Sequence, residues 1–128
     1  MKYDDLLRVP YKAHGRDPAT GLDCYGLVVE CCRRAGTPLI DPYYESDKVP
    51  MTEVAEYIAQ GLNVREIASG RVGSIALMEY DSQIHVGYVA ERGQILHATY
   101  NKGVILSPIY LVNVLKYYEV VKNESKPI

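Results

Sequence analysis

The order of hydrophobic patterns along this chain constrains its fold more than any other feature. Asp23 precedes a segment with apolar residues at helical spacing, and Gly36 stands where such a helix would end. After Gly61 the pattern changes to short β-rich runs separated by turn residues. These runs are Val64–Ile67, Ser74–Glu79, Ile84–Ala90, Gln94–Thr99 and Val104–Leu106. Helices followed by a meander predict an α+β domain, with N-terminal helices packed on a C-terminal antiparallel β-sheet.

Further elements are expected around these two regions. Asp4–Arg8 is expected to form a short helix, and a second helix is expected to begin at Thr52, which has a cap-like pattern. Tyr110–Leu115 is expected as another short helix and Tyr117–Val121 as a closing strand. The tail that follows, 122–128, is polar and is expected to be frayed.

The helix after Asp23 begins with a cysteine, Cys24. The unpaired N–H groups and the positive dipole end of a helix start favour thiolate over thiol, so we expect a lowered pKa. With a base close by, such a thiol makes the protein a candidate cysteine hydrolase. Gly26, inside the first turn, lowers helix propensity by about 1 kcal/mol. A close packing requirement would explain why it is tolerated there.

The candidate bases are two histidines, His85 and His97, in β-rich runs on either side of the turn segment 91–93. A two-residue loop would place His97 opposite Tyr88, with His85 facing away from it. A three-residue loop would place His97 opposite Gly87, with both histidines on one face, roughly 7–8 Å apart by backbone. The sequence allows both registers. The third histidine, His14, lies in a loop-like segment and is expected at the surface.

Two histidines on one face have a chemical use. His85 could act as the base while His97 fixes its tautomer through a ring-nitrogen hydrogen bond. The alternatives are a buried structural cysteine and satisfied structural histidines. Zinc is disfavoured because Cys31 and Cys32 are adjacent, without the usual two-residue spacing, and no His-x-x-x-His pair occurs. We therefore expect neither a metal nor a cofactor.

Length and composition exclude several classes. The 128 residues fit one compact domain, so a single domain over 1–128 is expected. A net charge of −2 and a pI near 5.9 argue against a nucleic-acid partner. No apolar run reaches membrane-spanning length and no apolar signal core follows Met1, so we expect no membrane insertion and a cytoplasmic protein as synthesised. Three cysteines, an odd number, disfavour a disulfide scaffold.

Several motifs together resemble the NlpC-type cell-wall cysteine peptidases, a papain-like group. The segment 23–28 resembles their nucleophile motif, 85–89 their catalytic-histidine strand, and 96–98 the strand with the third polar residue. Pro10-Tyr11 resembles an upstream motif whose tyrosine lies beside the active site, and 71–77 resembles the strand entry before the histidine. The resemblance covers about Pro10 to Pro108 and implies a papain-like NlpC-type fold.

The chain departs from the usual family pattern at three places. Tyr25 follows the nucleophile where Ser is usual, and Ser74 stands where Asp is usual. After Pro-Tyr the chain reads Lys12-Ala13-His14-Gly15, where the family usually has an aromatic and a Gly pair. Tyr25 and the segment 15–21 look more like the phage and prophage subgroup, whose domains belong to tail-tip or tail-assembly proteins. That subgroup would add other phage tail proteins as partners, and the virion tail or the cell wall as the final location.

The resemblance implies that Cys24 attacks a peptide carbonyl of the peptidoglycan stem peptide, commonly after D-glutamate. His85 would deprotonate the thiol and later protonate the leaving amine, and His97 would orient His85. Backbone N–H groups at the helix start would hold the oxyanion. Tyr11, together with Asp23 and Tyr25 beside the nucleophile, is assigned to substrate and oxyanion binding.

Two other functions remain open. A phage tail component could keep the fold without the chemistry, although an intact Cys24, His85 and His97 argue against it. The second is a papain-like amidase or acyltransferase that acts on another small amide. The changes at Ala13 and Tyr25 are compatible with such a different activity.

Overall fold

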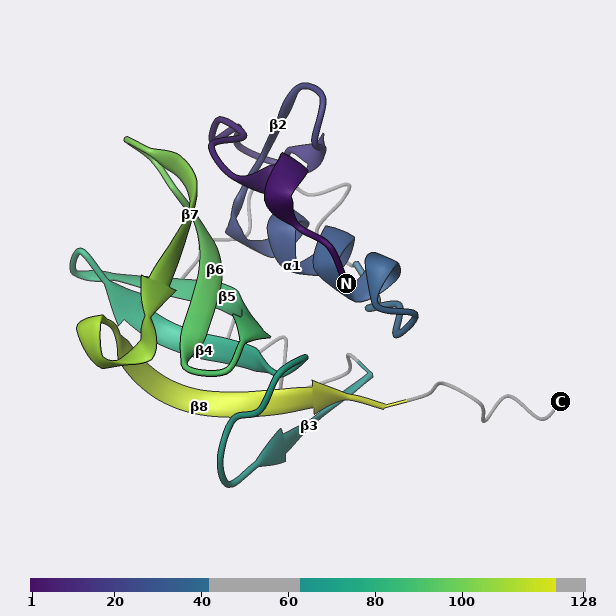
Figure 1. The fold of residues 1–128 in the computed structure, drawn as a ribbon, viewed down its shortest axis with the longest axis vertical. Helices are drawn as coiled ribbons and strands as arrows, with labels where there is room; N and C mark the ends of the chain where they lie inside the picture. Colours follow the sequence, from purple (N-terminus) through teal and green to yellow (C-terminus); the bar gives the residue numbers. More distant parts are fainter. Residues whose placement is uncertain (42–62, 122–128) are drawn as a thin grey trace, which may run out of the picture.

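The structure is a computed structural model that describes residues 1–41 and 63–121. In these residues one α-helix, α1, packs beside a six-stranded antiparallel sheet, with a short two-stranded ribbon near the helix start (Figure 1). The sheet order is β3-β8-β4-β5-β6-β7. The elements are η1 (Asp4–Leu6), β1 (Arg16–Asp17), β2 (Gly21–Leu22), α1 (Cys24–Arg34), β3 (Val64–Ile67), β4 (Ile75–Tyr80), β5 (Gln83–Glu91), β6 (Gln94–Thr99), β7 (Gly103–Pro108), η3 (Ile109–Leu111) and β8 (Asn113–Val120).

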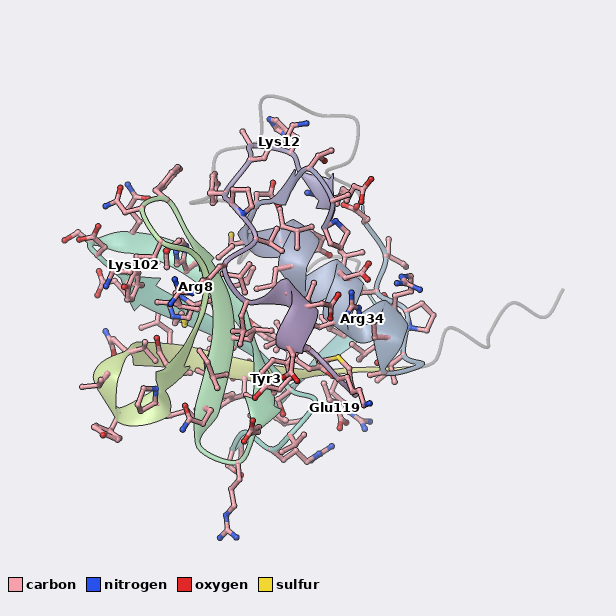
Figure 2. All side chains as sticks on the ribbon, turned by 45° about the horizontal axis from the view of Figure 1, so that its top comes forward. Tyr3, Arg8, Lys12, Arg34, Lys102 and Glu119 are labelled. Atoms are coloured by element: carbon pink, nitrogen blue, oxygen red, sulfur yellow. The ribbon has the colours of Figure 1, made fainter. Side chains whose placement is uncertain are left out.

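The ends of α1 follow from local chemistry. The Asp23 carboxylate accepts a hydrogen bond from the Gly26 backbone N–H at 2.7 Å, which satisfies one of the unpaired donors of the first turn. At the other end, Gly36 adopts a left-handed backbone with φ of +80°, as a helix stop requires. Arg34 of the last turn pairs with Asp5 at 2.7 Å and so holds the N-terminal segment against the helix (Figure 2). Both predicted helix boundaries are confirmed.

The sheet has two apolar faces. One face packs against the buried side of α1 and forms the main core with it. From the sheet this core takes Val86, Tyr88, Leu96, Ala98 and Val104, and from α1 it takes Leu27, Val28, Cys31 and Cys32. The opposite face carries a smaller cluster of Ala76, Met78, Val89 and Ile95, covered by residues of η3 and β8. Burial on both faces explains why these central runs contain so few polar residues.

The hairpin between β5 and β6 combines the two registers considered from sequence. At its tip Glu91 pairs with Gln94, as a two-residue loop requires. A bulge then shifts the register, so that Val89 pairs with Ile95 and Tyr88 with Leu96. Continued by one residue, this register brings His97 opposite Gly87, as the three-residue loop would. The face shared by His85 and His97 thus depends on the bulge.

The C-terminal part of the fold corrects one expectation. The predicted helix over Tyr110–Leu115 is wrong: Ile109–Leu111 forms a single 3-10 turn, and the chain then enters β8. The strand forms there because β8 is paired on both sides, with β3 and with β4, and this pairing outweighs local helix preference.

The remaining expectations have mixed outcomes. The short helix expected over Asp4–Arg8 is a 3-10 turn over Asp4–Leu6. The helix expected from Thr52 and the tail 122–128 lie outside the described residues. Over the two described stretches, no helix combines the length and apolar character needed to cross a bilayer.

Candidate active site

Cys24 lies at the start of α1, where the helix meets β5. Its side chain is 1% exposed and belongs to the main core. Burial raises the pKa of the thiol to about 12, although the backbone N–H groups of Val86 and Tyr25 lie beside the sulfur and favour the thiolate. The expectation of a lowered Cys24 pKa is therefore wrong for this state of the protein, because desolvation outweighs the helix start.

The nucleophile and the histidine strand are brought together at this point. The Val86 N–H beside the Cys24 sulfur belongs to the residue directly after His85. The helix start therefore contacts β5 at the residue next to the candidate base. The close packing expected for Gly26 is also present, because a Cβ on Gly26 would lie 2.0 Å from the Gly15 carbonyl oxygen.

His85 and His97 lie near each other with their rings edge to face. Their ring centroids are 6.0 Å apart at an interplanar angle of 67°. Tyr80 completes a three-ring group, stacking on His85 at 5.7 Å and meeting His97 edge-on at 4.8 Å. The contribution of Tyr80 was missed from sequence, where nothing distinguished it from the other eleven tyrosines.

Both rings are buried, and burial governs their protonation. It lowers the pKa of His85, although a hydrogen bond with the Ile84 backbone and the nearby Asp81 partly oppose the change. Burial and the neighbouring His85 lower the pKa of His97 to about 4. Both imidazoles are therefore neutral at pH 7, which is the state a general base requires. None of the hydrogen bonds among the described residues joins the two rings directly.

His97 is instead held from β7. Its Nε2 lies 2.8 Å from the Ser107 hydroxyl oxygen, and both side chains are buried. Its Nδ1 is buried without a hydrogen-bond partner. Among the described residues, no other buried side-chain nitrogen or oxygen atom lacks one.

Asp23 has a structural role. Besides capping Gly26, its carboxylate accepts from the His14 backbone N–H at 3.0 Å and pairs with Arg16 at 2.8 Å. Arg16 also binds Asp41 through two nitrogens, at 2.7 and 3.2 Å. Burial opposes the Arg16 charge, but the two carboxylates outweigh it and raise its pKa. These contacts give the Asp23 carboxylate a structural role, and its assignment to substrate or oxyanion binding stays a prediction.

The structural role of Arg16 was not predicted from the sequence. Its partner Asp41 is distant in sequence, and an arginine in a loop gives no sign of a buried ion pair. His14, by contrast, is exposed as expected.

The two tyrosines assigned to the site differ in their placement. Tyr11 stacks near Tyr100, with ring centroids 4.3 Å apart, and pairs with Leu22 in an isolated bridge. Burial, a hydrogen bond with Tyr100 and the proximity of Cys24 raise the Tyr11 pKa above its usual range. Tyr11 therefore lies beside the thiol, as expected.

Tyr25 is packed away from the surface. Its side chain is 3% exposed, its hydroxyl donates to the Ile40 carbonyl at 2.6 Å, and the Arg16 guanidinium lies over its ring. The ring thus fixes the helix start to the segment before Asp41, and the assignment of Tyr25 to substrate and oxyanion binding stays a prediction.

A small pocket of about 70 Å³ opens beside His85. Its walls come from the β4–β5 turn, His85 and the β6–β7 turn. Lys102 belongs to the latter turn and faces outward near Arg8, with which it lines a neighbouring hollow (Figure 2). The pocket gives His85 a route to ligands from outside the core.

Comparisons with known proteins agree with this architecture. No model of a protein family matches the chain, and no curated protein sequence matches it either. Among solved structures, it resembles the NlpC/p60 domain of the peptidoglycan hydrolase SagA, with a TM-score of 0.56 and 18% identity over 91% of this chain and 90% of that one. It also resembles a lipoprotein-like NLP/P60 family protein from Staphylococcus aureus, with a TM-score of 0.58 and 20% identity over 92% of this chain and 38% of that one.

At these identities the likeness establishes the fold. The chain has the α+β, papain-like architecture of NlpC/p60 domains, and the predicted fold class is confirmed.

Proposed function

We propose that this protein is a cysteine endopeptidase that hydrolyses amide bonds in peptidoglycan stem peptides. The observation that carries the proposal is the meeting of Cys24, at a capped helix start, with the strand of His85 and its neighbour His97. The two NlpC/p60 domains with the same fold support the choice of substrate, since one is named a peptidoglycan hydrolase.

The chemistry follows from the protonation states. His85 is neutral and takes the proton of the Cys24 thiol, and the sulfur attacks the peptide carbonyl. Backbone N–H groups at the helix start, including that of Cys24, stabilise the oxyanion. Protonated His85 then gives its proton to the leaving amine as the C–N bond breaks, which leaves a thioester. Water, deprotonated by His85, hydrolyses the thioester and restores the thiol.

The finer assignments rest on the sequence resemblance. We propose cleavage after D-glutamate and a place in a phage or prophage tail, which would deliver the domain to the cell wall. Tyr25, which fixes the helix start beneath Arg16, would shape the site indirectly. An alternative is a catalytically silent tail component, and the burial of Cys24 with its raised pKa is the observation that favours it.

The deciding experiment is mass spectrometry of purified sacculi digested with the wild-type protein, with Cys24→Ala and with Cys32→Ala. Cys32 is the matched control, because it is equally buried in α1 and lies outside the proposed machinery. We expect wild type and Cys32→Ala to release the same peptides, and folded Cys24→Ala to release none. Equal release by Cys24→Ala would refute the nucleophile, and no release by folded wild type would favour the silent component.

A further inference from the structure

The inference begins with the two ring nitrogens of His97, which have opposite surroundings. The side chain is 0% exposed, so bulk solvent reaches neither nitrogen. Nε2 has a partner in the Ser107 hydroxyl at 2.8 Å, whereas Nδ1 has none. A buried polar atom without a partner is unfavourable and calls for an explanation. The explanation we consider is that Nδ1 is kept free for a partner that arrives during the reaction.

The sheet register fixes Ser107 in this place. In the β6–β7 ladder His97 pairs with Ile105, and Ile95 pairs with Ser107. Ser107 is thus the diagonal neighbour of His97 on the same sheet face, within reach of a long side chain. Because Ser107 lies within the regular antiparallel β6–β7 ladder, its hydroxyl is held by backbone pairing with β6 and not by a loop.

The proton of neutral His97 can sit on either nitrogen, and the two choices differ in consequence. With the proton on Nδ1, Ser107 donates to Nε2, and an N–H is buried without an acceptor. With the proton on Nε2, the ring donates to the Ser107 oxygen, and Nδ1 is an open acceptor on a ring whose centroid lies 6.0 Å from that of His85. Only the second form lets His97 receive a ring N–H from His85.

We infer that Ser107 is a positioning residue: it holds His97 with the proton on Nε2, so that Nδ1 can accept the ring N–H of His85 when His85 takes the proton of Cys24. This inference rests on the proposed function. The ring centroids are 6.0 Å apart, and none of the hydrogen bonds among the described residues joins the two rings. Catalytic hydrogen bonds are often long before substrate binds and tighten afterwards.

The tautomer can be measured directly. Two-dimensional 15N NMR of histidine-labelled wild-type protein at pH 7 distinguishes the two neutral forms of each ring. We expect the Nε2–H form for His97 in wild type and in Ser107→Thr, which keeps the hydroxyl. We expect a mixture or the opposite form in Ser107→Ala. The Nδ1–H form in wild type would overturn the inference, and this measurement requires no variant to fold.

Kinetics provide the second readout. We expect Ser107→Ala to lower kcat for stem-peptide hydrolysis roughly tenfold, with KM little changed and the acid limb of the pH profile displaced. Ser107→Thr should recover most of the rate. Ser74→Ala is the matched control, because Ser74 is also buried at the sheet but bonds to the Arg71 backbone N–H at 2.9 Å. Equal kcat in Ser107→Ala and wild type would overturn the inference.

The two proposals fail in distinguishable ways. A wild-type protein without activity on sacculi, but with the Nε2–H form lost in Ser107→Ala, would refute the proposed function and support the tautomer assignment. An active wild type whose His97 tautomer is the same in Ser107→Ala would refute the role of Ser107 and leave the proposed function intact.

Discussion

At the residue scale, the Cys24 thiol is subject to two opposing effects. The helix start and the N–H groups of Val86 and Tyr25 stabilise a negative sulfur, while burial in the core destabilises it. Burial is the larger effect, so the thiol is protonated at neutral pH. The proton must then be removed during the reaction by a neutral base, and His85 is in that state.

The protonation state of Cys24 can be tested by alkylation. With a pKa of about 12, its rate of reaction with iodoacetamide should rise about tenfold for each pH unit between 7 and 9, without a plateau. Peptide mapping by mass spectrometry separates it from Cys31 and Cys32, whose pKa values burial also raises to about 12. A rate for Cys24 that is already level near pH 7 would show a preformed thiolate.

At the scale of the elements, the helix start depends on a backbone-to-backbone contact. Gly26→Ala should improve helix propensity by about 1 kcal/mol. The added Cβ would, however, lie 2.0 Å from the Gly15 carbonyl oxygen, which is backbone and cannot turn aside. We expect the clash to dominate and the free energy of unfolding to fall by roughly 1–3 kcal/mol in urea titrations.

Gly36→Ala provides a comparison at the other end of the same helix. A Cβ there meets no atom within 4 Å, and the left-handed backbone is the only source of strain. A loss in Gly26→Ala no greater than the loss in Gly36→Ala would contradict the close contact.

The same elements show how far sequence reasoning reaches. The cap of α1, its glycine stop and most strands are local, and their patterns predict them. The bulge that places His85 and His97 on one face needs one extra residue in β5. The residue types there do not indicate that a bulge will form. The closing strand expected over Tyr117–Val121 is the second half of β8, but its first half, from Asn113, could not be predicted, because its partner β4 is brought close only by the fold. The same holds for the ion pair of Arg16 with Asp41.

At the scale of the whole molecule, the site is built into the folded core. Cys24 belongs to the cluster between α1 and the sheet, and His97 is fully buried within the sheet. The groups that would carry the chemistry therefore also contribute to folding, through their burial and through their charge state.

This link predicts a pH dependence of stability. In the unfolded chain His97 takes up a proton near pH 6.5, whereas burial keeps it neutral in the folded protein down to about pH 4. The unfolded state thus binds more protons between these values, so stability is full above pH 6.5 and falls as the pH drops toward 4. The full difference corresponds to roughly 3 kcal/mol. Urea unfolding at pH 7.5, 5.5 and 4.5 measures it.

A His97→Gln variant isolates this contribution. Protonation of carboxylates with lowered pKa values, such as Glu30, also lowers the free energy of unfolding in acid. It does so in both proteins and mainly below pH 4.5. The free energy of unfolding of His97→Gln should therefore change less than that of wild type between pH 7.5 and 4.5. His85, whose pKa burial also lowers, remains in the variant and leaves it a smaller slope of the same sign. Equal slopes in the two proteins would mean that His97 accepts its proton without unfolding, and that the core around it is open to water.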